Sequence, residues 1–124
     1  SILKIAKEKE EVKIVNDQFA SPTYTPDLAK QIQKLITTDA FGLYHATSEG
    51  GCSWYEFAKE VFCLTKTTVN LQPISSSQLN SLAKRPKYSV LENAKLNTLH
   101  LNIMRPWKNG LSDYLAERGK KLIP

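Results

Sequence analysis

Glycine is scarce in this chain of 124 residues, and its placement excludes one large class of binding site. The five glycines stand at positions 42, 50, 51, 110 and 119. A dinucleotide-binding turn needs the spacing G-x-G-x-x-G, which lets a pyrophosphate approach the first turn of a helix. No stretch of this sequence has that spacing. We therefore expect no residue of this chain to bind a dinucleotide cofactor.

Cysteine and histidine are also few, and long apolar runs are missing. Cys52 and Cys63, with His45 and His100, do not match the ligand spacing of a zinc site, so we expect no metal ligand. Two cysteines in a chain with an ordinary apolar core favour reduced thiols over a disulfide. No apolar run approaches eighteen residues, and no signal-peptide pattern is present. The sequence therefore predicts a cytoplasmic protein without a membrane segment.

Arginine is also rare in this chain. Lysine and arginine total 17 against 12 acidic residues, for a net charge of +5, but only three of the 17 are arginines. A nucleic-acid-binding protein is expected to gather arginines and aromatic residues on one face. Scattered lysines instead favour an anionic small molecule, which a positive surface attracts. We expect no nucleic-acid partner, although a small basic module that binds nucleic acid remains an alternative.

Hydrophobic spacing and capping residues predict a mixture of helices and short strands. Strands are expected at residues 12–14, 43–46 and 69–73, and helices at the start of the chain and at residues 26–37, 53–62, 75–82, 93–99 and 106–119. This order predicts an α/β fold of one domain with a modest core.

Several helix ends and core positions can be named in advance. Ser53 and Glu56 form a capping box, and Thr25 is expected to cap the helix that Pro26 opens. Asn93 is expected to cap a helix, and Gly119 to end the last one. The expected core residues of the helix after Ser53, together with the second tryptophan, are Trp54, Phe57, Ala58, Val61, Phe62 and Trp107.

The turn between the first strand and the helix at Pro26 is unusually rich in chemistry. Residues 16–28 carry a carboxylate, amides, hydroxyls and aromatic rings within a few positions. Loops with such content often bind ligands. A rigid turn bracketed by prolines, whose polar groups only satisfy their own backbone, is an equally open interpretation.

Five segments in order carry a family resemblance: VNDQFASPTYTPDLA from Val15, GLYHATSEGG from Gly42, SWYEFAKEV from Ser53, RPKYSVLENAKL from Arg85 and RPWKNGLSDYL from Arg105. Together they resemble the C-terminal, substrate-binding part of dTDP-4-dehydrorhamnose reductases and of the wider extended short-chain dehydrogenase/reductase group. One departure is Ala20, where the family usually has glycine. A left-handed backbone at an alanine would cost roughly 1–2 kcal/mol.

The resemblance implies which residues bind the substrate. Arg85 would hold the diphosphate of a dTDP-sugar, and Ser89 belongs to the same motif. The candidates for the sugar and base side are Gln18, Phe19, Pro22 and Thr23. Asp27 is expected to be structural.

A catalytic role is not expected for any residue of this chain. Tyr55 and Lys59 have the spacing of the family's catalytic tyrosine and lysine, but the resemblance places them in the substrate-binding part. His45 is expected to be structural, and no serine stands in a nucleophile-elbow motif.

The resemblance thus implies that residues 1–124 form a C-terminal sugar-nucleotide-binding domain, cut at its N-terminal side and lacking the Rossmann half. The whole protein would use NAD(P)H to reduce a 4-keto nucleotide sugar in dTDP-L-rhamnose biosynthesis for surface polysaccharides, and this chain alone would be inactive. Apolar surface left by the missing Rossmann domain would favour a homodimer. A non-catalytic subunit on the same fold, like the methionine adenosyltransferase regulatory subunit, remains an alternative.

Overall fold

The computed structural model of this chain describes residues 2–79, 83 and 85–121. Its α-helices are α1 (Ile2–Glu8), α2 (Thr25–Leu35), α3 (Trp54–Leu64), α4 (Ala94–Thr98) and α5 (Trp107–Lys121), and a 3-10 helix, η1, covers Ser76–Gln78. The strands are β1 (Glu11–Val15), β2 (Phe19–Ala20), β3 (Cys52–Ser53) and β4 (Asn70–Ile74). The predicted α/β mixture of helices and short strands is confirmed. No helix in these described ranges is long and apolar enough to cross a membrane.

The chain forms two compact units, each built from two separate segments. The first unit contains Ser1–Ala20 and Cys52–Ser89, and the second contains Ser21–Gly51 and Val90–Pro124. The two units are described separately below.

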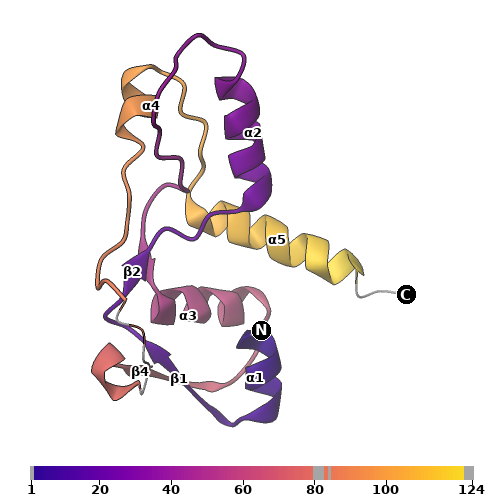
Figure 1. The fold of residues 1–124 in the computed structure, drawn as a ribbon. Helices are drawn as coiled ribbons and strands as arrows, with labels where there is room; N and C mark the ends of the chain where they lie inside the picture. Colours follow the sequence, from indigo (N-terminus) through magenta and orange to yellow (C-terminus); the bar gives the residue numbers. More distant parts are fainter. Residues whose placement is uncertain (1, 80–82, 84, 122–124) are drawn as a thin grey trace. The chain divides into compact units, whose positions relative to one another are not determined.

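The first unit is built on a parallel pair of strands, β1 and β4, with α3 packed against them (Figure 1). Val12 and Val15 of β1 are buried, while Glu11 and Lys13 between and beside them face solvent. From α3, Ala58, Val61 and Phe62 are buried in the same core. Burial at helical spacing on α3 matches the apolar pattern of the sequence, whereas Val12 and Val15 are three positions apart and lie on opposite faces of β1.

At the start of α3, the predicted capping box is confirmed and the predicted burial of Trp54 is wrong. Ser53 and Glu56 form the expected capping box: the Ser53 hydroxyl accepts from the Glu56 amide at 3.1 Å, and the Glu56 carboxylate accepts from the Ser53 amide at 2.8 Å. The prediction that Trp54 is a core residue is wrong, because 41% of its surface is exposed. Side chains tilt toward a helix's N-terminus, so an indole at the first helical position projects past the core.

Two further predictions in the first unit need adjustment. The strand expected at residues 69–73 lies at Asn70–Ile74 and passes through Pro73, which is paired in register with Ile14. The helix expected at residues 75–82 is the short η1, whose capping box from Ser75 to Gln78 is formed as predicted. The last part of that prediction, residues 80–82, lies outside the described residues.

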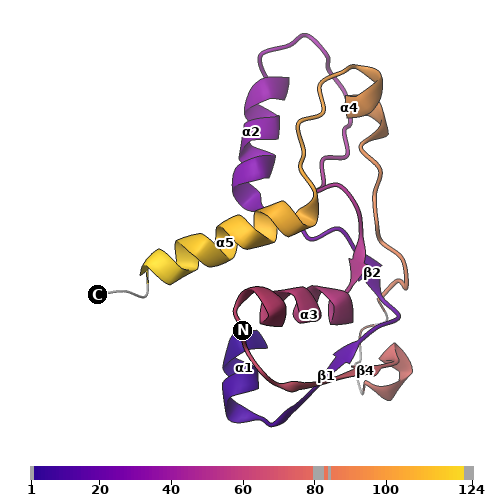
Figure 2. The same ribbon diagram turned by 180° about the vertical axis from the view of Figure 1, so that it is seen from behind.

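Figure 2 shows the helices of the second unit, α2, α4 and α5, from behind. Buried polar side chains rather than an apolar stripe anchor α2 in this unit. Asp27 is buried and accepts two pairs of hydrogen bonds from the Arg105 guanidinium, the shortest at 2.8 Å. Gln31 is buried too, donating to the Leu101 carbonyl at 3.2 Å and accepting from the Ile103 amide at 2.8 Å. These bonds tie the helix to the segment before α5, so the structural role expected for Asp27 has a clear basis.

The expected cap of α2 and the expected strand at residues 43–46 are both wrong. Tyr24 occupies the cap position without a side-chain hydrogen bond, and Thr25 is already helical. Residues 43–46 are not a strand, because no described segment pairs with them. Instead, Lys95 holds the adjoining loop: its ammonium donates to the Phe41 carbonyl at 3.2 Å and lies 4.3 Å from the ring centre of Tyr44.

The last two helices also differ from expectation at one end. Asn93 precedes α4, but its side chain does not cap that helix and pairs with the Thr47 backbone, donating at 2.8 Å and accepting at 2.9 Å. The prediction that Gly119 ends the last helix is wrong, because α5 continues to Lys121. Trp107, as predicted, is buried.

Several large apolar side chains of the second unit are exposed. Phe41 and Leu43 are 84% and 83% exposed, and Ile32 and Ile36 of α2 are exposed as well. An apolar group of this kind is typical of a surface that meets another protein surface. The pairing of two copies stays a prediction.

Two helical glycines provide a matched test of packing in the second unit. A Cβ at Gly110 would lie 2.6 Å from the Tyr24 Cβ, whereas nothing lies within 4 Å of one at Gly119. We expect Gly110→Ala to lower the free energy of unfolding by roughly 1–3 kcal/mol through overpacking. Gly119→Ala should raise it by roughly 0.5–1 kcal/mol, as usual in a helix. Urea unfolding measures both, and equal effects would contradict the close contact at Gly110.

Candidate functional site

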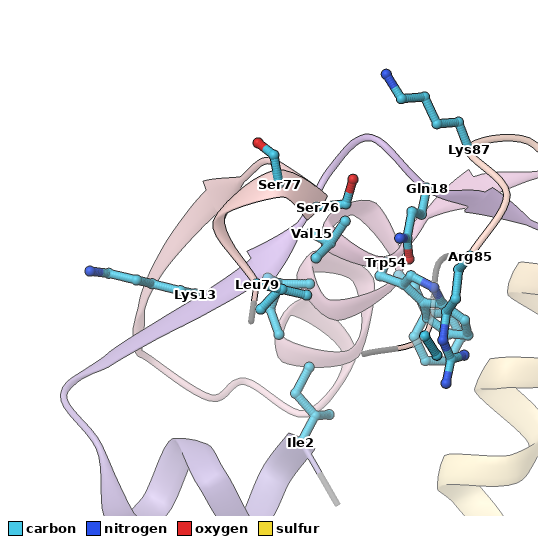
Figure 3. Close-up of a pocket in the computed structure, with 13 residues that line it drawn as sticks. Ile2, Lys13, Val15, Gln18, Trp54, Ser76, Ser77, Leu79, Arg85 and Lys87 are labelled. Atoms are coloured by element: carbon cyan, nitrogen blue, oxygen red, sulfur yellow. The ribbon is translucent and has the colours of Figure 1, made fainter. Parts of the chain in front are cut away.

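The first unit contains a cavity of about 890 Å³ that runs along β1 (Figure 3). Its lining comes from α1, β1, the turn after β1, the start of α3, η1 and the segment that follows η1. The lining residues are Ile2, Lys13, Ile14, Val15, Gln18, Trp54, Phe57, Ser76, Ser77, Leu79, Ala83, Arg85 and Lys87. Small-molecule sites typically have volumes of roughly 300–1,000 Å³ and mostly apolar walls with a few polar groups. We therefore take this cavity as the candidate site.

Among the described residues that line the cavity, all the charged ones are cations: Lys13, Arg85 and Lys87. Lys13 pairs with Glu11 at 3.3 Å. Among the residues that the structure describes, Arg85 and Lys87 have no carboxylate partner. The charge at the rim is therefore available to a ligand, and its sign favours an anionic one. A guanidinium can hold two phosphate oxygens at once.

The backbone of Phe19 joins three parts of the cavity wall. On one side, β2 pairs antiparallel with β3, placing Phe19 opposite Ser53. On the other side, the Phe19 amide donates to the Lys87 carbonyl at 2.8 Å, and its carbonyl accepts from the Ser89 amide at 2.9 Å. Lys87 is itself bonded to Phe19, Gln18 precedes Phe19 in the chain, and Trp54 follows Ser53. The pairing therefore brings these three side chains to one site.

Asp17 fixes the position of η1. Its carboxylate accepts from the Ser76 amide at 2.8 Å, the Ser76 hydroxyl at 2.9 Å and the Ser75 hydroxyl at 3.1 Å. The Ser76 amide is the main reason that the pKa of Asp17 is lowered, since each of these bonds favours the charged form. The Ser76 and Ser77 side chains are thereby held in the cavity wall, where Ser76 and Ser77 can offer polar atoms to a ligand.

The structure places the six predicted substrate-binding residues in different settings. Gln18 and Arg85 line the cavity. Phe19 and Ser89 lie in the adjoining strand junction, where the Ser89 hydroxyl donates to the Phe19 carbonyl at 3.0 Å. The remaining two, Pro22 and Thr23, belong to the second unit, whereas the lining residues that the structure describes all belong to the first unit.

Thr23 has a clear structural setting of its own. Its hydroxyl donates to the Ser21 carbonyl at 3.0 Å and accepts from the Ser48 amide at 3.1 Å. Ala20, where the family usually has glycine, lies in β2, and its φ is not positive. No strain arises from the alanine.

Sequence reasoning missed several cavity residues, of which Trp54 is the largest. Its spacing from Ala58 and Val61 predicted that it lies on the buried face of α3. Only its position at the start of the helix indicated that it would be exposed. Ser76, Ser77 and Lys87 had no distinguishing pattern. Tyr55 and Lys59, which have the spacing of the family's catalytic pair, do not line the cavity.

The histidines and cysteines are not among the residues that line the cavity. His45 is exposed, and Cys52 and Cys63 form no disulfide. In the described part of the chain, no group of three or more histidine, cysteine or acidic residues is placed to hold a metal ion.

A family model described as the RmlD substrate binding domain matches residues 1–119. The chain belongs to this family. The family resemblance inferred from the sequence motifs is therefore confirmed, and the cavity lies in an RmlD substrate-binding domain.

Solved structures of similar proteins agree with this assignment. The dTDP-4-dehydrorhamnose reductase of Bacillus anthracis, solved in complex with NADP, is 40% identical, with a TM-score of 0.88 over 94% of this chain and 41% of its own. The corresponding protein of Clostridium acetobutylicum is also 40% identical, with a TM-score of 0.92 over 95% of this chain and 42% of its own.

Among curated proteins, the spore coat polysaccharide biosynthesis protein SpsK of Bacillus subtilis is 36% identical over 95% of this chain and 41% of its own length. The dTDP-4-dehydrorhamnose reductase of Streptomyces griseus is 32% identical over 90% of this chain and 39% of its own. The RmlD domain described here thus spans about two fifths of the length of the relatives it matches.

The bonds from Asp17 to η1 predict a pH-dependent contribution to stability. A carboxyl group whose folded-state pKa is lowered stabilises the fold above its unfolded-state pKa of about 3.9 and loses this effect as the pH falls through the folded-state value. We expect Asp17→Ala to lower the melting temperature at pH 7. The difference from the wild type should shrink progressively below about pH 4.

Glu8→Ala serves as the control, because Glu8 is an exposed carboxylate whose ion pair with Lys4 measures 3.9 Å. Exposed pairs of this kind contribute roughly 0–1 kcal/mol. An Asp17 effect that is the same at pH 7 and at pH 2 would show that the charge on Asp17 does not stabilise η1.

Proposed function

We propose that this chain is the substrate-binding part of a dTDP-4-dehydrorhamnose reductase and that its cavity holds the nucleotide diphosphate of a 4-keto sugar. Membership of the RmlD substrate-binding family supports the class of reaction. In the whole protein, NAD(P)H would supply a hydride to the keto sugar, in dTDP-L-rhamnose biosynthesis. Because this chain has no dinucleotide turn, we assign no part of the hydride transfer to its residues.

The observation that carries the proposal is the joint presence of Arg85 and Gln18 in one cavity. Family motifs nominated both residues, and they come from segments far apart in the sequence. The cavity has no acidic lining residue and two cations without a carboxylate partner among the described residues. A diphosphate carries the complementary charge, and the volume of about 890 Å³ leaves room for the attached sugar.

The chain's own residues would bind and orient the substrate. Arg85 would hold two phosphate oxygens in a bidentate fork, while Lys87 would add charge. The Ser76 and Ser77 hydroxyl oxygens would accept from hydroxyl groups of the sugar, because their own hydrogens already bond to Asp17 and Ser75. The apolar walls from Ile14 and Val15 would exclude water, which strengthens these polar contacts.

Arg85→Lys should weaken dTDP binding by roughly ten- to a hundredfold, because lysine keeps the charge but loses one of two charge-assisted hydrogen bonds, worth about 1.5–3 kcal/mol. Isothermal calorimetry with dTDP measures the change. The matched control is Arg118→Lys in the second unit, which leaves the cavity untouched and should bind dTDP like the wild type. Equal affinity of the Arg85→Lys variant and the wild type would assign Arg85 a structural role instead.

The 124-residue chain by itself should not oxidise NADPH in the presence of dTDP-4-keto-6-deoxy-L-mannose, because it has no dinucleotide-binding turn. Absorbance at the nicotinamide band measures the reaction. As a positive counterpart, the chain can replace the matching 42% of the Clostridium acetobutylicum protein. We expect that chimera to reduce the keto sugar and to lose activity on Arg85→Ala substitution.

Two outcomes would contradict the proposal that this chain binds the nucleotide sugar and that another part of the protein binds NADPH. Saturable NADPH binding by the chain alone would return Tyr55 and Lys59 to consideration as catalytic residues. A folded chimera that binds NADPH but neither binds nor reduces the dTDP-sugar would show that the cavity serves another ligand.

A further inference from the structure

Asp17 is a carboxylate that hydroxyl groups, rather than a cation, contact. Its Oδ2 accepts from the Ser76 hydroxyl at 2.9 Å and from the Ser75 hydroxyl at 3.1 Å, while its Oδ1 accepts from the Ser76 amide at 2.8 Å. Among the described residues, no lysine or arginine forms an ion pair with Asp17. A cation would neutralise the carboxylate, whereas hydroxyl groups leave its negative charge beside η1.

This carboxylate fixes the direction of every hydrogen bond that the three serines make through their hydroxyl groups. An ionised carboxylate only accepts, so the Ser75 and Ser76 hydroxyls donate to Asp17. The hydroxyl oxygens of Ser75 and Ser77 are 2.9 Å apart, and because the Ser75 hydrogen already bonds to Asp17, Ser77 is the donor of this bond. The lowered pKa of Asp17, caused mainly by the Ser76 amide, keeps the carboxylate ionised at neutral pH.

Two of these serines, Ser76 and Ser77, line the cavity, and their hydroxyl oxygens have only acceptor lone pairs left. A hydrogen-bond chain that ends at a charge is polarised, which strengthens the oxygen as an acceptor. Such oxygens suit a neutral hydroxyl group of a ligand, whereas an ionised phosphate also only accepts and is repelled by Asp17. Figure 3 shows Ser77 and Arg85 on opposite sides of Val15, so the acceptors and the guanidinium lie apart.

We propose that Asp17 is the positioning residue that sets η1 to accept hydrogen bonds, and that η1 thereby orients the ligand in the cavity. The donor would be a sugar hydroxyl group of the ligand, on its pentose or on its hexose ring. The inference rests on the proposed function, since it takes the ligand to be a nucleotide sugar. With the diphosphate at Arg85, a hydroxyl group at η1 would fix which way round the ligand lies.

Three probes of equal charge test this inference by calorimetry on the full 124-residue chain. They are dTDP-glucose, the methyl ester of dTDP, and the 3′-deoxy form of that ester. A contact with the hexose makes dTDP-glucose bind more tightly than the methyl ester, and a contact with the pentose makes the methyl ester bind more tightly than its 3′-deoxy form. We expect the wild type to show one of these preferences, at roughly two- to tenfold, the range for one neutral hydrogen bond.

Variants of η1 and of Asp17 separate positioning from stability. Ser76→Ala combined with Ser77→Ala removes the accepting oxygens, so it should abolish the preference and leave binding of the 3′-deoxy ester unchanged. Asp17→Asn keeps the side chain's shape but donates from its amide to the serine oxygens, so the preference should shrink. Added to the two alanine substitutions, Asp17→Asn should change the preference no further, because Asp17 acts through the serines.

Glu8→Gln is the matched control, because it makes the same chemical change at an exposed carboxylate that does not line the cavity. This variant should keep the wild-type preference. Equal weakening of all three probes by Asp17→Asn would give Asp17 a structural role only. If Asp17→Asn lowers the melting temperature too far for calorimetry, the double alanine variant still decides whether η1 recognises the hydroxyl group.

The outcomes for the wild type separate this inference from the proposed function. Equal binding of the three probes, or a preference that survives the double alanine substitution, would overturn the role of η1 while leaving the diphosphate site at Arg85 intact. Failure to bind any of the three probes would overturn the proposed function and this inference with it. A preference that the serine variants abolish and Asp17→Asn reduces would support it.

Discussion

The candidate site depends on one constraint, the pairing of the short strand β2 along both of its edges at Phe19. Its amide and carbonyl bond to Lys87 and Ser89 at 2.8 and 2.9 Å, and β3 pairs along its other side. Buried backbone groups left unpaired are costly, so this junction holds three segments in one register. Gln18 and Trp54 stand next to the paired residues, and the cavity is the consequence.

In both units, hydrogen bonds and ion pairs hold short helices and loops in position. In the first unit, Asp17 secures η1, and in the second unit Asp27 and Gln31 secure α2. Asp27 is buried, and Arg105 satisfies its carboxylate from a partly exposed position. Removing one partner of such a pair is far more costly than the pair's net contribution, because an unpaired buried charge remains. These anchors therefore specify where loops lie rather than supply most of the stability.

The proposed ligand explains two features that packing alone leaves unexplained. Packing of the core alone does not require an exposed indole. Nor does it require an arginine that has no carboxylate partner among the described residues. The charge of Arg85 is complementary to the proposed diphosphate, and Trp54 adds an exposed aromatic surface to the same cavity. The relatives named as dTDP-4-dehydrorhamnose reductases make this ligand class the natural one to test first.

The sequence by itself determined the family, the helix order, the α3 capping box and the choice of Gln18 and Arg85, because local spacing and ordered motifs carry that information. Only the tertiary structure decided which residues meet. Trp54 had core spacing, but the tilt at a helix start turned it into the cavity. Residues 43–46 had strand spacing, but a strand also needs a partner, which no described segment supplies. Contacts between distant segments depend on backbone pairing, as at Phe19, and local patterns do not encode it.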